Sequence, residues 1–310
     1  MKSSHLSIAA IVALVLACLL LLPKTRNETV TTEQDVKLAN RLLEKMYIKA
    51  KSAPASLREQ MVFAGENLLG TPYVGATLDE MEKEALSVFL TRTDCILFVE
   101  TCYNLARVTA ANVSSGKGPA TFDDLCKAIL QTRYREGRAE NYSDRIHYTT
   151  EWIRKGEAEG RLKDMTLDFG GVPFGDSINF MSTHPEKYRQ LKDFRTDTSA
   201  AIELQKIREV ESSLNEIPLT YIPEESIVSI EDRILSGDIV CFMASTKGLD
   251  IAHVALAYVQ EDPAAASGRK VGFMHASYSD GKVVVDELSI ADYVASRKSL
   301  NGIKIVRALK

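Results

Sequence analysis

Three side chains whose types suit nucleophilic catalysis stand far apart in this sequence: Cys95, His253 and His275. A thiol attacks a carbonyl carbon as its thiolate, and a neighbouring imidazole can hold that thiolate and later protonate the leaving amine. A further polar group that orients the imidazole completes such a site. The three residues therefore predict an enzyme with thiol chemistry, provided that the fold brings them together.

Cys95 stands at the predicted start of a helix. Asp94 is a good N-cap residue, and apolar residues follow at helical spacing. The unpaired N–H groups and the dipole at a helix start favour negative charge, so we expect the pKa of the Cys95 thiol to be lowered. The alternative is a small buried hydrophobic residue, which is the commonest fate of a cysteine taken alone.

The two histidines fall in two predicted strands, 251–259 and 271–278, which a connection rich in Pro, Ala, Ser and Gly separates. An antiparallel hairpin with its turn near Ala264 pairs Ala257 with Val271 and places the two imidazoles opposite each other on one face. Either histidine alone is more simply a core or surface residue. The pair favours function, because burying two imidazoles side by side is costly.

The composition is that of a globular protein. The chain has 310 residues, of which 45% are hydrophobic and 26% charged, enough for one large domain or two small ones. A net charge of -4 argues against a nucleic-acid partner, because affinity for phosphates comes mainly from clustered Lys and Arg. We interpret the basic stretch 133–138 as a solvated helix face.

The N-terminus has the layout of an export signal. Lys2 precedes an apolar run over residues 6–22, and Pro23 and two basic residues end it. Residues 1–26 are therefore predicted to be a signal peptide or an uncleaved membrane anchor, which leaves membrane association open. Cys18 adds a lipoprotein as a further alternative. We expect an exported protein, periplasmic or associated with the cell envelope.

The cysteines at positions 102, 126 and 241 are too sparse for a disulfide framework, and each lies in an apolar pattern typical of a core. The sequence lacks the CxxC and HExxH spacings of metal sites, so neither a metal nor another cofactor is expected.

The order of elements predicts an α+β fold, with helices first and an antiparallel sheet last. Helices are expected at about 33–51 and 57–69; the second stops at Gly70-Thr71-Pro72 and delivers Tyr73 ahead of the Cys95 helix. Residues 27–310 are predicted to form one catalytic domain, with a helical insertion around 121–216. The expected strands are 238–244, 251–259, 271–277, 282–288 and 302–307.

Motifs spread in order over most of the chain resemble those of the NlpC-type, papain-like cell-wall hydrolases. They are Leu69-Gly70-Thr71-Pro72-Tyr73, Asp94-Cys95, Ser236-Gly237-Asp238-Ile239-Val240, His253-Val254 and His275-Ala276-Ser277. A closer likeness, to the N-acetylmuramoyl-L-alanine amidase-like branch, is carried by residues 94–100, 143–148, 178–182 and 248–253.

The resemblance implies a papain-like core, in which a helix with the nucleophile packs on a small antiparallel sheet with the base. It implies Cys95 as nucleophile, His253 as base, His275 as orienting residue and Tyr73 near the oxyanion. Two departures concern specificity: Ile96 replaces the usual Ser after the cysteine, and Val74-Gly75-Ala76 replaces the usual Trp-Gly-Gly. Both border the peptide groove of the dipeptide-releasing endopeptidases.

The amidase branch therefore fits better. We expect a monomeric hydrolase that binds peptidoglycan fragments (muropeptides) and cleaves the amide between the lactyl group of N-acetylmuramic acid and L-alanine. The alternatives are a γ-D-glutamyl-diamino acid endopeptidase with the same three residues and a non-catalytic cell-wall binding module. Helical spacing favours a core position for Trp152. Six residues are candidates for substrate contact, each with a structural role as the alternative: Asp94, Arg145, His147, Tyr148, Asn179 and Asp250.

Overall fold

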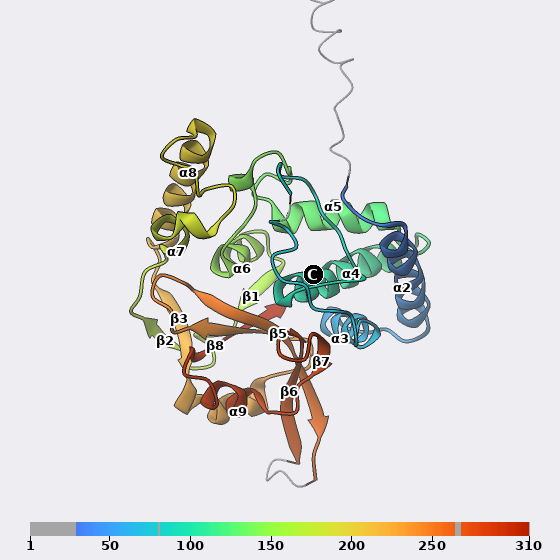
Figure 1. The fold of residues 1–310 in the computed structure, drawn as a ribbon. Helices are drawn as coiled ribbons and strands as arrows, with labels where there is room; N and C mark the ends of the chain where they lie inside the picture. The colour runs from blue at the N-terminus through green and yellow to red at the C-terminus, as the bar shows by residue number, and fades with distance from the viewer. Residues whose placement is uncertain (1–28, 80, 264–267, 310) are drawn as a thin grey trace, which may run out of the picture.

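The fold is a mixed α+β arrangement, seen in a computed structural model that describes residues 29–79, 81–263 and 268–309 (Figure 1). The predicted leader 1–26, with Cys18, lies outside the described residues. Within the described ranges, no helix is long and apolar enough to cross a membrane.

The first third of the chain forms helices, as predicted. They are α2 (Glu33–Ser52), α3 (Leu57–Asn67), α4 (Cys95–Ser114) and α5 (Phe122–Arg133). Capping boxes begin α2, α3 and α5, and the carboxylate of Asp94 begins α4 by accepting a hydrogen bond from Leu97 N–H at 2.9 Å. The predicted helix start at Cys95 is therefore confirmed.

The remaining helices are shorter or lie farther from Cys95. They are α6 (Thr149–Ala158), α7 (Phe180–Thr183), α8 (Thr198–Leu214) and α9 (Ile290–Ala295), with 3-10 turns η1 (Tyr142–Asp144), η2 (Pro185–Lys187), η3 (Glu224–Ser226) and η4 (Val228–Arg233). In Figure 1, α7 and α8 lie together at one end of the molecule, away from α2 and α3.

An antiparallel sheet of eight strands crosses the molecule in the order β2-β3-β8-β4-β5-β6-β7, with β1 also paired to β8. The strands are β1 (Leu162–Asp164), β2 (Val172–Phe174), β3 (Leu219–Pro223), β4 (Ile239–Ala244), β5 (Ile251–Glu261), β6 (Arg269–Ser277), β7 (Lys282–Val285) and β8 (Leu300–Ala308). The strands expected in the last third of the chain are confirmed.

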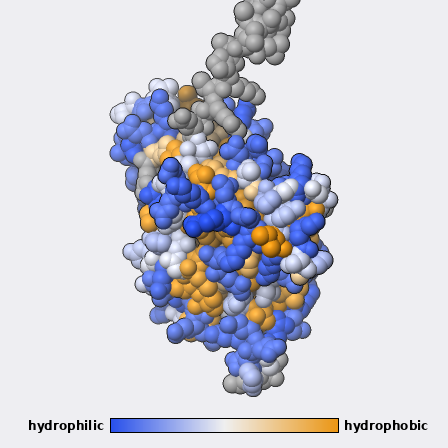
Figure 2. Space-filling model, turned by 90° about the vertical axis from the view of Figure 1, so that its right-hand side faces the viewer, coloured by the Kyte–Doolittle hydropathy of each residue, from blue (hydrophilic) through white to orange (hydrophobic). Residues whose placement is uncertain are grey.

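Both faces of the sheet are covered, which explains why every residue of β4 is buried. Alternate side chains of β4 and β5, such as Cys241 and Val254, pack in one core with α2 to α5. Their neighbours, such as Phe242 and Ala255, pack in a second core with α9. On the side shown in Figure 2, hydrophilic atoms cover most of the surface and apolar atoms form separate patches.

The segment 121–216 is less purely helical than expected, because β1 and β2 lie within it and join the sheet. Each of these strands has three residues, which is too short for an alternating pattern to appear in the sequence.

The predicted hairpin register is wrong by two residues: Ala257 pairs with Phe273 rather than with Val271. The strands also extend further toward the turn, where Glu261 pairs with Arg269. Because side chains alternate with period two, a shift of two residues keeps every side chain on its face. The hydrophobic pattern cannot distinguish the two registers.

Candidate active site

Cys95 is the first residue of α4 and lies next to β5, the strand that contains His253. Its sulfur accepts a hydrogen bond from the backbone N–H of Val254, the residue next to His253 in β5. The segment before α4 is itself fixed, because the buried carboxylate of Asp35 accepts hydrogen bonds from the N–H groups of Leu90 and Thr91, each at 2.8 Å.

The expected lowering of the Cys95 pKa is wrong. Burial and, to a lesser extent, the negative charge of Asp94 raise the pKa of the thiol to about 12. Three backbone N–H groups lower the pKa of the thiol, but their effect is smaller than that of burial. They belong to Val254, Ile96 and Cys95 itself. The N-cap that begins the helix therefore also opposes the thiolate at its first residue.

His253 and His275 lie within hydrogen-bonding distance, with 2.7 Å between Nε2 of His253 and Nδ1 of His275. The rings stand edge to face at 83°. When the register of β5 and β6 is continued past Leu256 and Met274, His253 and His275 are diagonal neighbours rather than directly opposite. Long side chains can span this separation. Burial, together with the charges of His275 and Arg297, lowers the pKa of His253 to about 3.

Asp286, immediately after β7, lies at the far side of this pair. Its Oδ2 is 3.2 Å from Nε2 of His275, a ring that is buried. Val284 is paired with His275 across β6 and β7, so Asp286 occupies the next diagonal position on the same face. His253, His275 and Asp286 thus form a line across three adjacent strands.

Tyr73 lies beside α4 because backbone hydrogen bonds join its segment to two neighbouring loops. Its N–H donates to the carbonyl of Gly281 at 2.8 Å, and the N–H of Val74 donates to the carbonyl of Thr93 at 2.8 Å. Burial, with a smaller contribution from the nearby Cys95, raises the pKa of Tyr73 to about 12. The hydroxyl therefore remains a hydrogen-bond donor at neutral pH.

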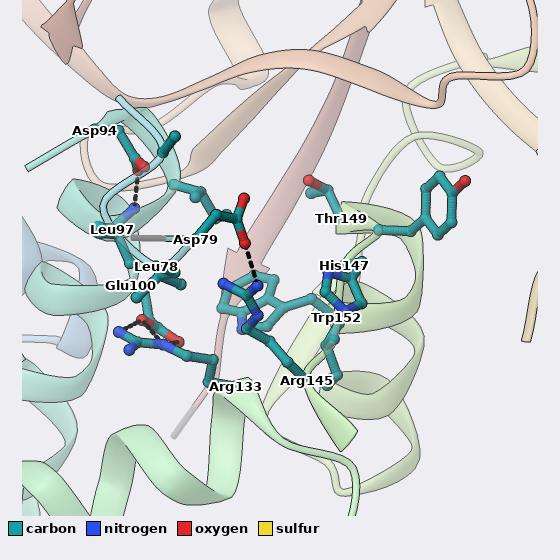
Figure 3. Close-up of a pocket in the computed structure, with 14 residues that line it drawn as sticks. Leu78, Asp79, Asp94, Leu97, Glu100, Arg133, Arg145, His147, Thr149 and Trp152 are labelled. Carbon is teal, nitrogen blue, oxygen red and sulfur yellow. Dashed lines mark hydrogen bonds and ion pairs between the residues drawn. The ribbon is translucent and has the colours of Figure 1, made fainter. Parts of the chain in front are cut away.

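A cavity of about 180 Å³ opens beside the N-terminus of α4 (Figure 3). Apolar side chains of α4 and α6, among them Ile96, Leu97 and Trp152, line part of it, and charged side chains line the rest. Trp152 is buried in the core against Tyr103, as expected, and presents one side to the cavity.

Of the six residues expected to contact substrate, four line this cavity: Asp94, Arg145, His147 and Tyr148. Arg145 is ion-paired with Asp79, and its Nε lies 3.6 Å from Glu84, so its charge is already balanced by two carboxylates (Figure 3). Burial and the charge of Arg145 lower the pKa of His147 well below its ordinary value. The imidazole of His147 is therefore neutral at neutral pH.

The other two, Asn179 and Asp250, do not reach the cavity. The backbone N–H of Asn179 donates to the carbonyl of Gly248 at 2.9 Å. Asp250 is buried and accepts a hydrogen bond at 2.8 Å from the N–H of Thr150, in the first turn of α6. The Asp250 carboxylate holds the start of α6 in place, so the structural alternative fits this residue better, whereas the contact of Asn179 involves only its backbone.

Tyr148 combines a position in the cavity lining with a structural role for its hydroxyl. Its ring lines the cavity, but its hydroxyl is committed elsewhere: it donates to Oε1 of Glu211 at 2.6 Å and accepts from the N–H of Met181 at 2.9 Å. The hydroxyl therefore joins α6, α7 and α8 and is not available to a ligand.

Several cavity residues were not anticipated from the sequence. The interpretation of 133–138 as a solvated helix face is wrong for Arg133, which is buried and forms an ion pair with Glu100 at the base of the cavity, with Nε of Arg133 2.9 Å from Oε2 of Glu100. Asp79 comes from a loop in which no local pattern marks it. Within the described ranges, no group of three or more His, Cys, Asp or Glu residues is arranged to hold a metal ion.

A family model for AmiA-like proteins, described as N-acetylmuramoyl-L-alanine amidase-like, matches residues 63–303, which include all of these site residues. The chain belongs to this amidase-like family. The predicted likeness to N-acetylmuramoyl-L-alanine amidase-like proteins is thereby confirmed. No curated protein matches the sequence.

Several solved structures are similar to this chain. An N-acetylmuramoyl-L-alanine amidase from Bacteroides uniformis is 27% identical with a TM-score of 0.70, and the match covers 83% of this chain and all of that one. A Bacteroides fragilis protein named, provisionally, as a xylanase is 28% identical with a TM-score of 0.67, covering 79% of this chain and 99% of that one. A Legionella pneumophila protein, 19% identical over 89% of this chain and 96% of its own, shares the fold with a TM-score of 0.64.

Proposed function

We propose that this protein is a cysteine-dependent peptidoglycan amidase, which hydrolyses the amide between the lactyl group of N-acetylmuramic acid and the L-alanine of the stem peptide. One observation carries the proposal: Cys95, at the start of α4, lies near the β5 backbone next to His253, which is hydrogen-bonded to His275, and the neighbours Asp94 and Ile96 line a mixed polar and apolar cavity. Membership of the amidase-like family supports the choice of bond.

The resting site holds a neutral thiol and a neutral imidazole, because burial disfavours the charged form of each. His253 therefore acts as a general base during attack. Its Nε2 is engaged with His275, so Nδ1 takes the proton from Cys95 as sulfur adds to the lactyl carbonyl carbon.

The tetrahedral intermediate then collapses. The C–N bond breaks, His253 passes its proton to the departing amine of L-alanine, and a thioester remains on Cys95. Water adds to the thioester as His253 takes a proton again. The C–S bond then breaks, His253 returns the proton to the sulfur of Cys95, and N-acetylmuramic acid is released. The backbone N–H of Cys95 and the hydroxyl of Tyr73 are the proposed oxyanion donors, each contributing about 3 kcal/mol when well placed.

The cavity beside α4 is proposed to hold the muramoyl-peptide next to the scissile amide. Its lining combines apolar walls with a few fixed polar groups, which is typical of sites for small ligands. Ile96 presents an alkyl group where a hydroxyl would favour a peptide carboxylate, which supports the amidase over a dipeptide-releasing endopeptidase.

The test uses a soluble N-acetylmuramoyl tripeptide and mass spectrometry of the products. Cys95→Ala and Cys95→Ser should abolish release of a peptide that begins with L-alanine. Cys126→Ala removes a buried thiol outside the site and should retain release. Substantial activity in Cys95→Ala would refute the nucleophile, a muramoyl-dipeptide product would support the endopeptidase, and no product from the wild type would support a binding module.

A further inference from the structure

We infer that Asp286 is a positioning residue of this site: its carboxylate fixes the tautomers of both imidazoles, so that Nδ1 of His253 is the free base. The inference rests on the proposed function. Its evidence is the line that His253, His275 and Asp286 form across β5, β6 and β7.

The acceptor for His275 is decided by elimination within the structure. Nε2 of His275 is buried, and no well-aligned hydrogen bond reaches it from any residue of the described ranges. The nearest charged oxygen is Oδ2 of Asp286 at 3.2 Å. A buried N–H without an acceptor is costly, and catalytic hydrogen bonds that are poorly aligned in the free enzyme tighten when substrate binds.

The direction of the protons follows from this contact. A carboxylate only accepts hydrogen bonds, so Nε2 of His275 carries the proton and Nδ1 of His275 carries a lone pair. That lone pair lies 2.7 Å from Nε2 of His253, which must therefore be the protonated nitrogen of that ring. Nδ1 of His253 is left unprotonated, as a general base requires.

The carboxylate is held in its orientation by its own backbone neighbours. Oδ1 of Asp286 accepts a hydrogen bond from the N–H of Leu288 at 2.8 Å, and the N–H of Asp286 donates to the carbonyl of Phe273 at 3.0 Å. One carboxylate oxygen is thus engaged with the backbone while the other faces His275.

Burial and the nearby charges together set the pKa of each imidazole. Asp286 and Asp280 raise the pKa of His275, whereas burial and Arg297 lower it, and the net direction is downward. The pKa of His253 is lowered by burial and by the charges of His275 and Arg297. Both imidazoles are consequently neutral at neutral pH, and a tautomer can be assigned to each.

The rings also have fixed walls. Phe273 lies edge-on to His275, with centroids 4.9 Å apart, and the ring of Tyr293 from α9 lies near both imidazoles. The aromatic walls restrict rotation of the rings but offer no strong acceptor to Nε2. Among the residues that the structure describes, the carboxylate of Asp286 is therefore the group that we infer to determine which nitrogen of each ring is protonated.

Two substitutions separate tautomer control from loss of charge. In Asp286→Asn, the N–H of Leu288 needs the amide oxygen, so the NH₂ group is directed at His275. This reverses both tautomers and protonates Nδ1 of His253. Asp286→Ala removes the carboxylate that fixes the tautomers but supplies no donor that would reverse them. We expect kcat to fall about tenfold in Asp286→Ala and about a hundredfold or more in Asp286→Asn, with KM little changed.

The decisive readout is ¹⁵N NMR of histidine-labelled protein, which identifies the protonated nitrogen without any substrate. The wild type should show Nε2–H tautomers for both rings, Asp286→Asn should show Nδ1–H tautomers, and the exposed control Glu287→Gln should match the wild type in spectrum and kcat. An unchanged spectrum in Asp286→Asn would overturn the inference. A wild type that releases no stem peptide would instead refute the proposed function, because the NMR result does not depend on activity.

Discussion

The thiol of Cys95 should be slow to react with a neutral alkylating agent in the absence of substrate. With a pKa of about 12, it is ionised to about 1 part in 10⁵ at pH 7, whereas a free cysteine of pKa about 8.5 is ionised to about 3%. A more basic thiolate is intrinsically more nucleophilic, which recovers about 30-fold of the roughly 3,000-fold difference. Net alkylation at pH 7 should therefore be about 100-fold slower than for a free cysteine.

The perturbation that tests this reasoning is Asp94→Asn, which preserves an N-cap side chain but removes the charge that helps to raise the pKa of Cys95. Each unit by which the pKa of Cys95 falls should raise the rate at pH 7 about 3-fold to 4-fold. The rate of iodoacetamide labelling is measured for the wild type and for Asp94→Asn from pH 5 to 10. Peptide mapping restricts the measurement to Cys95.

The wild-type rate should climb through this range without a plateau. A pH-independent rate between pH 5 and 8, at or above the rate of a free cysteine, would refute the argument. That result would show a thiolate and an imidazolium already paired in the resting enzyme.

Three further substitutions test the surroundings of the site. Glu100→Gln should cost about 3 to 5 kcal/mol in urea unfolding, because it leaves Arg133 buried without its carboxylate; a loss below about 1 kcal/mol contradicts this. Gly248→Ala should cost about 1 to 3 kcal/mol, since φ is +83° and the new Cβ would lie 2.3 Å from Oδ1 of Asn179; an unchanged melting temperature contradicts this. Ile96→Trp should fill the cavity and raise KM at least about tenfold, without changing the alkylation rate of Cys95; an unchanged KM argues that substrate lies elsewhere.

The helix start at Cys95 could be predicted from the sequence because its determinants are local. Asp94 as a cap and the apolar spacing of α4 act within a few residues. The pKa of the thiol could not be predicted in the same way. Burial, which dominates it, is set by β5 and other elements that the local pattern does not include.

The meeting of His253 and His275 was predicted, although the register that led to it was wrong. A two-residue shift preserves the face of each side chain, and imidazoles are long enough to meet diagonally. The same alternation, extended to β7, would have placed Asp286 beside His275. The signal was present, but its use required the register of a third strand.

The substrate contacts were the least predictable part of the site. Arg145 reached the cavity, but its partners Asp79 and Glu84 come from a loop without a periodic pattern. Asp250 has a carboxylate suited to binding, yet the fold uses it to hold the start of α6, and Asn179 lies outside the cavity. Residue type alone cannot distinguish these uses, because loops and helix ends demand the same polar groups that ligands do.

The most direct test of the central claim is the mass of the acyl group trapped on Cys95 when the enzyme is acid-quenched during turnover of an N-acetylmuramoyl tripeptide. Cleavage of the lactyl amide by a thiol predicts an N-acetylmuramoyl thioester on the peptide that contains Cys95. An adduct that still contains L-alanine and D-glutamate, or one attached to another residue, would contradict the account.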